Sequence, residues 1–530
     1  MLLACSSWLA AAELPNVVFI YADDLGYGDL ACHGHPRIET PNLDRLAREG
    51  TDFQSFTVVS PVCSSSRTGI VTGQFPSRWG AYQHFASHAQ NVERGMPDWL
   101  DPRAPLLPRI LQQAGYATAH YGKWHLSGGG IADAPLPAAY GYDDAAVWTG
   151  PGRAVFEGTP YEKKLPLEGG AHDAVAASYL SVAATDHTLK FIREAAGKKP
   201  FYINLWLHET HHLVSATEED KTPYPDVEEP LRTYYAAVTR ADRQVGRVLD
   251  LLDELSLAER TLVIFSSDNG PENSHDKPGQ KFYFSQGYTG GLRGRKRSLL
   301  MGGVNVPFLV RWPGQVPAGR VDAETAVAAV DVLPTLLDAA KLPLPKGYIS
   351  DGESLWPAFQ GQKQTREKPV FWIWRGGHAG DDWPALAMRE GPWMLILDET
   401  GERVELYDVV TDRFEANNRA SEFPDRVAKM RQALKAWEAE QPNEIDPRLQ
   451  TQQPPAGAPS RGNSTPPSRA EIFVKKDLNR DGRLTLEEYL HRFPDPVEGR
   501  RRFPGFDRDG DGFLSREEFE RPNQKKPTAP

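Results

Sequence analysis

The chain has 530 residues, of which 40% are hydrophobic and 25% are charged. This composition is typical of a globular protein with room for one large domain and smaller ones. The net charge of −11, from 71 acidic and 60 basic residues, argues against a nucleic-acid-binding protein and is still compatible with a local cationic pocket for an anion.

The first residues have the character of an export signal. Residues 1–12 are rich in leucine and alanine, Leu2-Leu3-Ala4-Cys5 resembles a lipoprotein box, and the later alanines resemble a cleavage site. We therefore expect residues 1–13 to be the tail of an export signal that starts upstream, and the protein to be periplasmic or secreted, with lipid anchoring as an alternative. A frayed hydrophobic end is the other interpretation. No later segment has the ~18 apolar residues of a membrane span.

Two short apolar runs end in oxygen-bearing side chains. Residues 16–21 lead into Asp23-Asp24-Leu25-Gly26, and residues 261–266 lead into Asp268-Asn269-Gly270. Continuous β-branched and aromatic runs of this length are typical of strands buried on both faces, as in a parallel sheet. Because ligands bind at the carboxyl ends of strands in open α/β sheets, the two ends are predicted to converge on one cation.

Between these runs lies Cys63-Ser64-Ser65-Ser66-Arg67, a cysteine among small hydroxyl residues. Small neighbours leave access to the sulfur, and Arg67 would favour an anion at the same place or stabilise a thiolate. A buried structural cysteine is the alternative interpretation. The other cysteines are Cys5 and Cys32, so no intrachain disulfide can form if Cys5 leaves with the leader and Cys63 is used chemically.

Further periodic segments complete an α/β pattern. Helices are predicted over residues 106–114 and 234–255, and a third buried strand over 200–206, which leads into His208-Glu209-Thr210-His211-His212. The alternation of strands and helices predicts an α/β sandwich over residues 14–335.

The pattern of predicted strands and helices changes after Pro334. Short antiparallel strands are predicted within residues 370–407 and a helix over 426–440, which together suit a smaller α+β subdomain over 336–440. Residues 441–469 concentrate Pro, Gln, Gly and Ser and are predicted to form an extended, mobile linker.

Two calcium-binding loops are predicted beyond the linker, within residues 470–522. Both have oxygen-bearing side chains, a glycine and a final glutamate at the spacing of the twelve-residue EF-hand loop. Two tandem matches make a polar Asp/Gly-rich linker the weaker interpretation, and for an exported protein we expect a permanently filled structural pair. The predicted calcium residues are Asp477, Asn479, Asp481, Arg483, Thr485 and Glu488, then Asp507, Asp509, Asp511, Phe513, Ser515 and Glu518.

Motifs in a fixed order carry a family resemblance over roughly residues 15–440. The chain resembles the formylglycine-dependent (type I) sulfatases of the alkaline phosphatase-like superfamily. This implies a large mixed β-sheet sandwiched by helices, a smaller C-terminal subdomain with an antiparallel sheet, and then the helical EF-hand pair. The motifs are Asp23-Asp24-Leu25-Gly26, Cys63-Ser64-Ser65-Ser66-Arg67, Gly122-Lys123-Trp124-His125-Leu126, Thr210-His211, Ser267-Asp268-Asn269-Gly270, Leu292-Arg293-Gly294-Arg295-Lys296 and Asp331-Val332-Leu333-Pro334-Thr335.

The same resemblance implies a nucleophile and a cation. A formylglycine-generating or sulfatase-maturing enzyme would oxidise Cys63 to Cα-formylglycine (3-oxoalanine), whose hydrate attacks the sulfur of a sulfate ester. Ca²⁺, with Mg²⁺ as an alternative, suits the hard oxygen ligands of the site. The implied metal ligands are Asp23, Asp24, Cys63, Asp268 and Asn269.

The catalytic residues that the resemblance carries over are Cys63, Arg67, Lys123, His125, His211 and Lys296. Arg67, Lys123 and Lys296 would form an electrostatic clamp around the anion. His125 is the expected base for collapse of the sulfated intermediate, and His211 and Lys296 are placed near the leaving oxygen.

Other histidines are ranked lower. His208 and His212 flank His211 and are expected to support the site or face the substrate. His33, His35, His84 and His88 are expected to be ordinary polar residues.

The chain departs from the family pattern at three positions. Ser65 stands where the family more often has Pro or Ala, which leaves the maturing enzyme open. Met301 and Asn305 replace the usual Glu and Arg, and altered packing is expected there more than lost chemistry.

The leading hypothesis is a hydrolase of sulfate esters on a sugar or polysaccharide, similar to arylsulfatases and N-acetylgalactosamine-6-sulfatases. Specificity is expected from residues 83–98, 128–152 and 272–287. A phosphonate monoester or phosphodiester hydrolase on the same scaffold is the first alternative, because a cationic clamp alone does not separate sulfate from phosphate. A catalytically dead calcium-dependent binding protein is the second, and the complete set of site residues argues against it.

Overall fold

The architecture comes from a computed structural model that describes residues 14–162, 179–272, 283–376, 380–442, 444–452, 469–490, 500, 503–504, 506–507 and 509–520. The chain divides into two compact units, Met1–Ala456 and Gly457–Pro530. No helix among the described residues has both the length and the apolar character needed to cross a membrane. The expected export signal at residues 1–13 lies outside the described residues.

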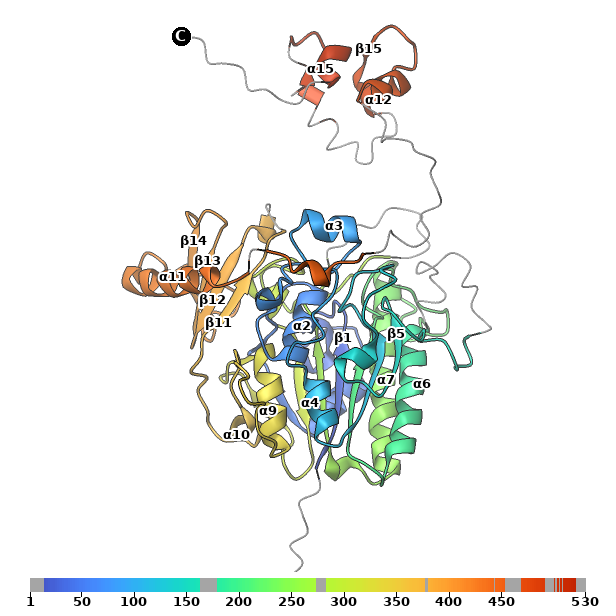
Figure 1. Cartoon of the computed structure of the whole chain (residues 1–530), viewed down its shortest axis with the longest axis vertical. Helices are drawn as coiled ribbons and strands as arrows, with labels where there is room; N and C mark the ends of the chain where they lie inside the picture. Colours follow the sequence, from blue (N-terminus) through green and yellow to red (C-terminus); the bar gives the residue numbers. More distant parts are fainter. Residues whose placement is uncertain are drawn as a thin grey trace, which may run out of the picture. The chain divides into compact units, whose positions relative to one another are not determined.

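An eight-stranded mixed sheet forms the centre of the larger unit (Figure 1). The strands from β5 to β7 run parallel, and β8 is antiparallel to both of its neighbours. The predicted strands at residues 16–21, 200–206 and 261–266 are confirmed as β1, β6 and β7. In sheet order the strands are β5 Asp144–Trp148, β4 Ala117–Lys123, β6 Phe201–Trp206, β1 Asn16–Ala22, β7 Thr261–Ser267, β8 Phe308–Arg311, β2 Thr51–Phe53 and β9 Arg320–Asp322.

Successive side chains of β1 enter two different cores, one on each face of the sheet. Val17, Phe19 and Tyr21 belong to a core that includes α2, α4 and α9, whereas Val18 and Ile20 pack with α1, α6 and α7. Every residue of β1 is therefore buried, which explains its continuous apolar run. The helices are α2 Cys63–Thr72, α4 Leu107–Gln113 and α9 Val332–Ala339 on one face, and α1 Pro41–Arg48, α6 Leu180–Ala195 and α7 Leu231–Glu254 on the other.

The predicted C-terminal subdomain is an antiparallel meander, as expected. Helix α11 covers it, and Phe371 stacks on Trp437 with ring centroids 4.8 Å apart. Trp372 Nε1 donates to the Val58 carbonyl at 2.7 Å, so the meander continues the core on the α2 face. The elements are β11 Val370–Ile373, β12 Leu386–Glu390, β13 Trp393–Leu397, β14 Val404–Asp408 and α11 Pro424–Ala439; the shorter ones elsewhere are β3 Phe56–Thr57, α3 His88–Glu93, α8 Met301–Val304, β10 Val327–Ala328 and α10 Trp356–Phe359.

The segment expected to be an extended linker begins instead with packed residues. Gln441 is buried and accepts a hydrogen bond from Ser77 Oγ at 2.8 Å. A 3-10 helix, Pro447–Leu449, follows. The Leu449 side chain packs against Trp99, Ile131 and Ala134, because an apolar residue in this segment meets an apolar patch of the larger unit. Residues 453–468, the remainder of the expected linker, lie outside the described residues.

The smaller unit contains the two predicted EF-hand loops. Strands β15 and β16 pair between the loops, with Leu484 opposite Leu514. A small apolar core of its own contains Phe473, Tyr489 and Phe519 beside these leucines. The elements are α12 Arg469–Lys476, β15 Arg483–Leu484, α13 Leu486–Leu490, β16 Leu514–Ser515 and α15 Arg516–Glu520.

Candidate active site

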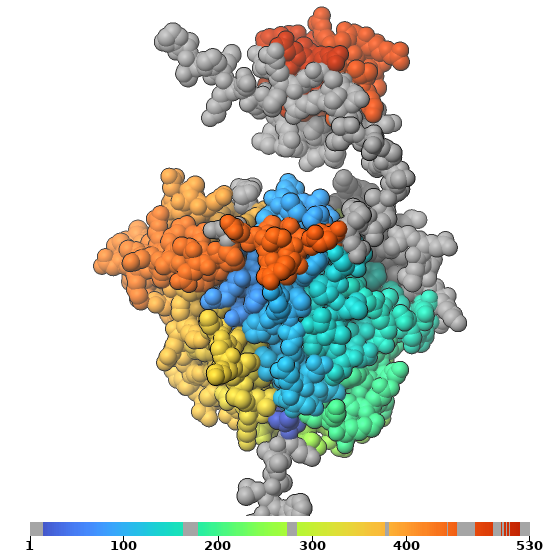
Figure 2. Space-filling model, in the orientation of Figure 1, coloured from blue at the N-terminus to red at the C-terminus, as the bar shows by residue number. Residues whose placement is uncertain are grey.

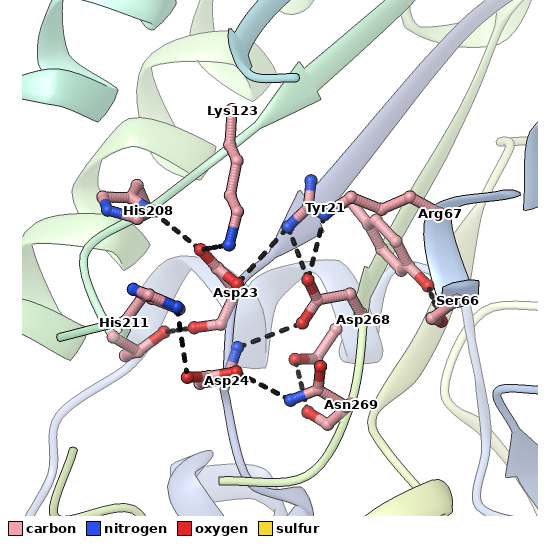
Figure 3. Close-up of polar contacts among 12 residues, drawn as sticks. Tyr21, Asp23, Asp24, Ser66, Arg67, Lys123, His208, His211, Asp268 and Asn269 are labelled. Atoms are coloured by element: carbon pink, nitrogen blue, oxygen red, sulfur yellow. Dashed lines mark hydrogen bonds and ion pairs between the residues drawn. The ribbon is translucent and has the colours of Figure 1, made fainter. Parts of the chain in front are cut away.

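Two strand ends bring the predicted acidic residues together (Figure 3). β1 and β7 are parallel neighbours that end in register, with Ala22 opposite Ser267, so the residues that follow them emerge side by side. Asp24 has a φ of 60°, which is uncommon for a residue with a Cβ, and its backbone nitrogen donates to Asp268 Oδ1 at 3.1 Å. Asn269 Nδ2 donates to Asp24 Oδ1 at 2.7 Å. The predicted convergence of the strand ends is confirmed.

Cys63 opens helix α2 at the same place. It is the first residue of the helix, where the helix dipole favours negative charge, and it is buried. Its sulfur belongs to a group of ligand atoms from Asp23, Asp24 and His211 that all lie within 4.8 Å of one another. Burial raises the pKa of the thiol to about 12, so the sulfur is protonated at neutral pH. The activated thiolate that the sequence allowed does not fit this environment.

Each buried carboxylate has a cationic partner. Arg67 donates from Nε and Nη2 to Asp268 Oδ2 at 3.0 and 2.6 Å. Lys123 Nζ donates to Asp23 Oδ2 at 2.6 Å. Lys296 Nζ donates to Asp24 Oδ2 at the same distance, 2.6 Å. The three cations predicted to clamp an anion therefore surround the acidic cluster.

The carboxyl groups differ in their ease of ionisation. Burial alone would raise the pKa of Asp23, but its electrostatic interactions with His211 and Lys123 hold it well below its usual value. Burial raises the pKa of Asp268 to about 7 in spite of Arg67, and it also raises the pKa of Asp24 in spite of Lys296. The cluster therefore needs positive charge to remain fully ionised.

Two buried oxygens in this cluster fit a hard cation. Among the residues that the structure describes, Asp23 Oδ1 and Asn269 Oδ1 are buried without a hydrogen-bond partner, although Arg67 Nη2 lies 3.5 Å from Asp23 Oδ1. A metal ion would give both oxygens a close partner. Asp24 and Asp268 add carboxylate oxygens. A thiol at position 63 is a poor match for Ca²⁺ or Mg²⁺, whereas an oxygen there would complete a set of hard ligands.

The site histidines have defined ring orientations. His125 Nε2 lies 3.0 Å from the carbonyl of Phe85 and donates to it, which leaves Nδ1 as the acceptor; Nδ1 is buried with no partner in the described part of the chain. His211 Nδ1 donates to the His212 carbonyl at 2.6 Å, so Nε2 faces Asp24 Oδ2 at 3.9 Å. Burial holds the pKa of both rings well below its ordinary value. The neutral ring is therefore the resting form of both histidines.

The supporting histidines fall in different places. His208 Nδ1 lies 2.7 Å from Asp23 Oδ2, in keeping with the supporting role expected for it. His212 is exposed and packs against His211, with ring centroids 4.5 Å apart and the ring planes tilted by 33°. His33 binds Asp52 and the Tyr27 carbonyl, an ordinary polar role, as expected.

Two residues near the site, His84 and Glu272, lie in segments that were expected to set specificity, but neither was singled out as a site residue from the sequence. The His84 ring lies 6.3 Å from the His125 ring, although His84 was expected to be an ordinary polar residue. Glu272 Oε2 lies 3.6 Å from Lys296 Nζ, and the same carboxylate pairs with Arg297. Glu272 follows the end of β7 closely and could have been found from that position. His84 carries no comparable signal, because its approach to His125 depends on tertiary packing.

Two of the unusual positions support the backbone around the site. Asn305 Nδ2 donates to the Gln54 and Phe56 carbonyls at 3.1 and 2.8 Å. Met301 N donates to Glu415 Oε2 at 2.9 Å. Both contacts are structural, in line with the expectation of altered packing.

The calcium loops of the smaller unit have the backbone that their glycines predict. Gly482 and Gly512 adopt φ of 82° and 85° at the sharp turn, and the loop carboxylates of Asp477 and Asp507 accept hydrogen bonds from them at 3.0 Å each. Asp507, Asp509 and Asp511 bring carboxylate oxygens within 4.8 Å of one another. Glu488 and Glu518 accept from the backbone nitrogens of Thr485 and Ser515 in their own loops. Both loops are thus shaped to receive a cation.

Three family models match the chain. The model described as Sulfatase matches residues 15–342, and the model described as N-sulphoglucosamine sulphohydrolase, C-terminal, matches residues 295–440. The model described as EF hand matches residues 470–493 and 506–521.

Similar proteins of known name agree with these matches. N-acetylgalactosamine-6-sulfatase of Canis lupus familiaris is 33% identical over 386 residues, which cover 68% of this chain and 69% of that protein. Arylsulfatase A of Homo sapiens is 32% identical over 406 residues, covering 70% and 73% of the two chains.

Solved structures share the fold. Ps i-CgsB in complex with k-i-k-neocarrahexaose has a TM-score of 0.68 at 25% identity, covering 81% of this chain and 94% of that chain. Phosphonate monoester hydrolase SpPMH from Silicibacter pomeroyi has a TM-score of 0.56 at 19% identity, covering 81% and 96%, a likeness that shows the fold alone.

Proposed function

The chain belongs to the sulfatase family and is a sulfuric ester hydrolase; from that premise we propose that it removes sulfate from a sulfated saccharide, with a formylglycine derived from Cys63 as the nucleophile and one divalent cation. Similar proteins support the saccharide: one is named N-acetylgalactosamine-6-sulfatase, and one structure holds k-i-k-neocarrahexaose. The phosphonate monoester hydrolase neighbour contributes only the fold.

The position of Cys63 is the observation that carries this proposal. The residue starts α2 in a buried group with Asp23, Asp24 and His211, where a protonated thiol has no evident use. An aldehyde hydrate at this position would present an oxygen nucleophile to an anion at the positive end of the helix. It would also supply the oxygen that the hard ligand set requires.

The residues around position 63 divide the work between charge and proton transfer. The cation, when bound by Asp23, Asp24, Asp268, Asn269 and residue 63, would polarise the sulfate and favour a deprotonated oxygen. Lys123 and Lys296 place positive charge on either side of the cluster and stabilise charge that develops on the sulfate. Arg67 holds Asp268 in place from the buried side.

Two histidines suit the proton transfers. Because Phe85 O fixes the Nε2–H of His125, its Nδ1 is free to accept a proton as the base. His211 turns Nε2 toward the cluster, and this atom can supply a proton to the leaving oxygen only after it has taken one up. The Lys296 ammonium, which binds the same Asp24 carboxylate, already carries a proton that the leaving oxygen can receive. These roles of His125 and His211 remain part of the proposal.

Turnover of nitrophenyl sulfate, compared with nitrophenyl phosphate and phosphonate esters, tests the reaction. We expect sulfate ester cleavage in the wild type and in Cys32→Ala, which removes an exposed cysteine as a matched control, and no turnover in Cys63→Ala. A marked preference for phosphate or phosphonate esters would show that the natural substrate is not a sulfate ester. Full activity in Cys63→Ala would contradict the assignment of residue 63 as the nucleophile.

Mass spectrometry of the peptide that contains residue 63 tests the modification. Active protein from its native host should carry formylglycine, installed by a formylglycine-generating or sulfatase-maturing enzyme. An unmodified thiol in active protein would overturn the mechanism. Screening defined sulfated saccharides then identifies the sugar and the sulfate position.

The remaining expectations belong to the same proposal. We propose an exported protein, periplasmic or secreted, with Ca²⁺ in the active site and in both EF-hand loops. Domain limits of 14–335, 336–440 and 470–522 remain our proposed division, with the amended linker described above.

A further inference from the structure

One loop touches both the helix that carries Cys63 and the proposed base. This loop comprises residues 83–98. Ser65 Oγ donates to the Gln83 carbonyl at 2.8 Å, and Phe85 N donates to Ser64 Oγ at 2.9 Å, so the loop is bound to the first turn of α2. The carbonyl of Phe85 receives His125 Nε2–H at 3.0 Å. The backbone of Phe85 therefore sets the position of His125 relative to Cys63.

Asp98, at the far end of the loop, organises its interior. Its side chain is fully buried, and Oδ1 accepts from Asn91 Nδ2 at 2.8 Å while Oδ2 contacts His88 Nδ1 at 2.8 Å. Asn91 in turn holds both backbone groups of Ala86, accepting from its nitrogen at 2.8 Å and donating to its carbonyl at 3.0 Å. Ala86 is bonded directly to Phe85. A short chain of contacts thus leads from Asp98 to the carbonyl that orients His125.

Residues 444–452, here called the strap, close over this loop from outside. Figure 2 shows the orange end of the larger unit crossing the blue surface. Asp98 N donates to the Leu449 carbonyl at 2.8 Å, and Thr451 N donates to Asp98 Oδ2 at 2.8 Å. The strap therefore supplies one acceptor and one donor to the same buried residue.

Further contacts also attach the strap to the larger unit. Leu449 packs against Trp99, Ile131 and Ala134, and Gln452 N donates to Asp133 Oδ2 at 3.1 Å. Asp133 also accepts from the Thr451 hydroxyl. The Asp98 carboxylate is held by Thr451 N together with Asn91 Nδ2 and His88 Nδ1, so loss of the Thr451 N–H would weaken the hold on its orientation.

We propose that the strap is a positioning element for catalysis: through Asp98 and Asn91 it fixes the loop that orients His125 against residue 63. Nothing in the family matches assigns this role, and it rests on the proposed function. None of the strap residues is expected to touch the substrate. Their effect is on the geometry of the proton transfer, to which catalysis is sensitive, since a displacement of about 1 Å can cost ~10²-fold in rate.

Thr451→Pro in the full chain tests this directly. Proline removes the backbone donor and the hydroxyl, and its ring also fixes φ near about −65°. The preceding Gln450, with φ of −118° and ψ of 144°, already has a conformation that proline tolerates next to it. Thr451→Val is the matched control, because it keeps the N–H that bonds Asp98. With nitrophenyl sulfate, we expect kcat of Thr451→Pro to fall about 10-fold or more with KM changed by less than about 3-fold. Thr451→Val should stay near wild type.

The measured kcat is divided by the formylglycine content from mass spectrometry, so that poor maturation is not mistaken for poor geometry. If Thr451→Pro does not fold, as judged by its melting transition, Leu449→Ala decides, with the same fall in kcat expected. The inference would be overturned if the variant that folds has the kcat of the wild type, or if only its KM changes. Failure of the wild type to cleave sulfate esters would instead overturn the proposed function.

Discussion

Arg67 and Asp268 form a buried pair in which one carboxylate oxygen receives two hydrogen bonds from the same guanidinium. Neither side chain has measurable solvent exposure, and the Arg67 guanidinium carbon lies 4.7 Å from the centre of the Trp206 ring. The forked, planar group satisfies the carboxylate and stacks on the aromatic ring at once. An ammonium group can pair with a carboxylate, but it has no planar surface that could stack on the ring while two of its N–H groups donate to Asp268.

Arg67→Lys should therefore reduce activity although it conserves charge. We expect kcat/KM for nitrophenyl sulfate to fall about 10²-fold or more, because Asp268 loses its orientation and one buried carboxylate becomes poorly paired. Arg193→Lys on α6, an exposed pair with Glu254, is the matched control and should have no effect. Wild-type kinetics in Arg67→Lys would show that the two hydrogen bonds from the planar guanidinium group are not needed.

Asp268→Ala should cost the protein one bound cation. Asp268 offers carboxylate oxygens beside the buried oxygens of Asp23 and Asn269 that have no hydrogen-bond partner, and its loss leaves too few hard ligands. Elemental analysis after dialysis should show one equivalent of metal less than in the wild type, with turnover lost. Asp250→Ala, at an exposed position on α7, controls for the loss of a surface carboxylate. Unchanged metal content would show that Asp268 is not a ligand of the metal ion.

The double variant Glu488→Gln/Glu518→Gln should empty the EF-hand loops and leave the active site filled. Each glutamate occupies the last loop position, where bidentate ligation is expected. We expect loss of two equivalents of calcium, faster proteolysis within residues 469–520, and unchanged kcat. Glu487→Gln, next to Glu488 on α13, is the control. Equal protease resistance in the presence and absence of a chelator would argue that the loops do not depend on calcium.

Much of the fold could be predicted because β1 and β7 are buried on both faces. Their apolar runs mark them as central strands, and the residues that end them must meet at one edge of the sheet. The convergence of Asp23 and Asp24 with Asp268 and Asn269 follows from this rule. Likewise, the spacing of the calcium loops predicts their turns without any tertiary information.

The parts that sequence reasoning missed depend on packing between distant segments. A Pro- and Gln-rich composition predicts an extended linker, yet Leu449 finds an apolar patch made by Trp99, Ile131 and Ala134. His84 approaches His125 only because loop 83–98 is bound to α2 and enclosed by the strap. No local sequence pattern predicts either contact, because the two partners are far apart in the chain.

Glu415 provides a test of stability against pH away from the catalytic cluster. Burial raises the pKa of its carboxyl to about 8, and the hydrogen bond from Met301 N and the charge of Arg293 only partly offset this. The folded state therefore holds a proton that the unfolded state releases near the ordinary glutamate pKa of about 4.3. Because the folded state binds more protons between these two values, the contribution of Glu415 to stability falls as pH rises from about 4.3 to about 8 and then levels off.

Glu415→Gln removes this titration while its amide oxygen can still accept from Met301 N. The variant should match the wild type at pH 4.5 and be more stable at pH 8.5, by on the order of 1–3 kcal/mol. Urea unfolding at both pH values, with calcium held constant, measures the difference. Glu402→Gln, at an exposed position of the same subdomain, should show no pH-dependent gain. A Glu415→Gln variant that is equally stable or less stable at pH 8.5 would contradict the raised pKa.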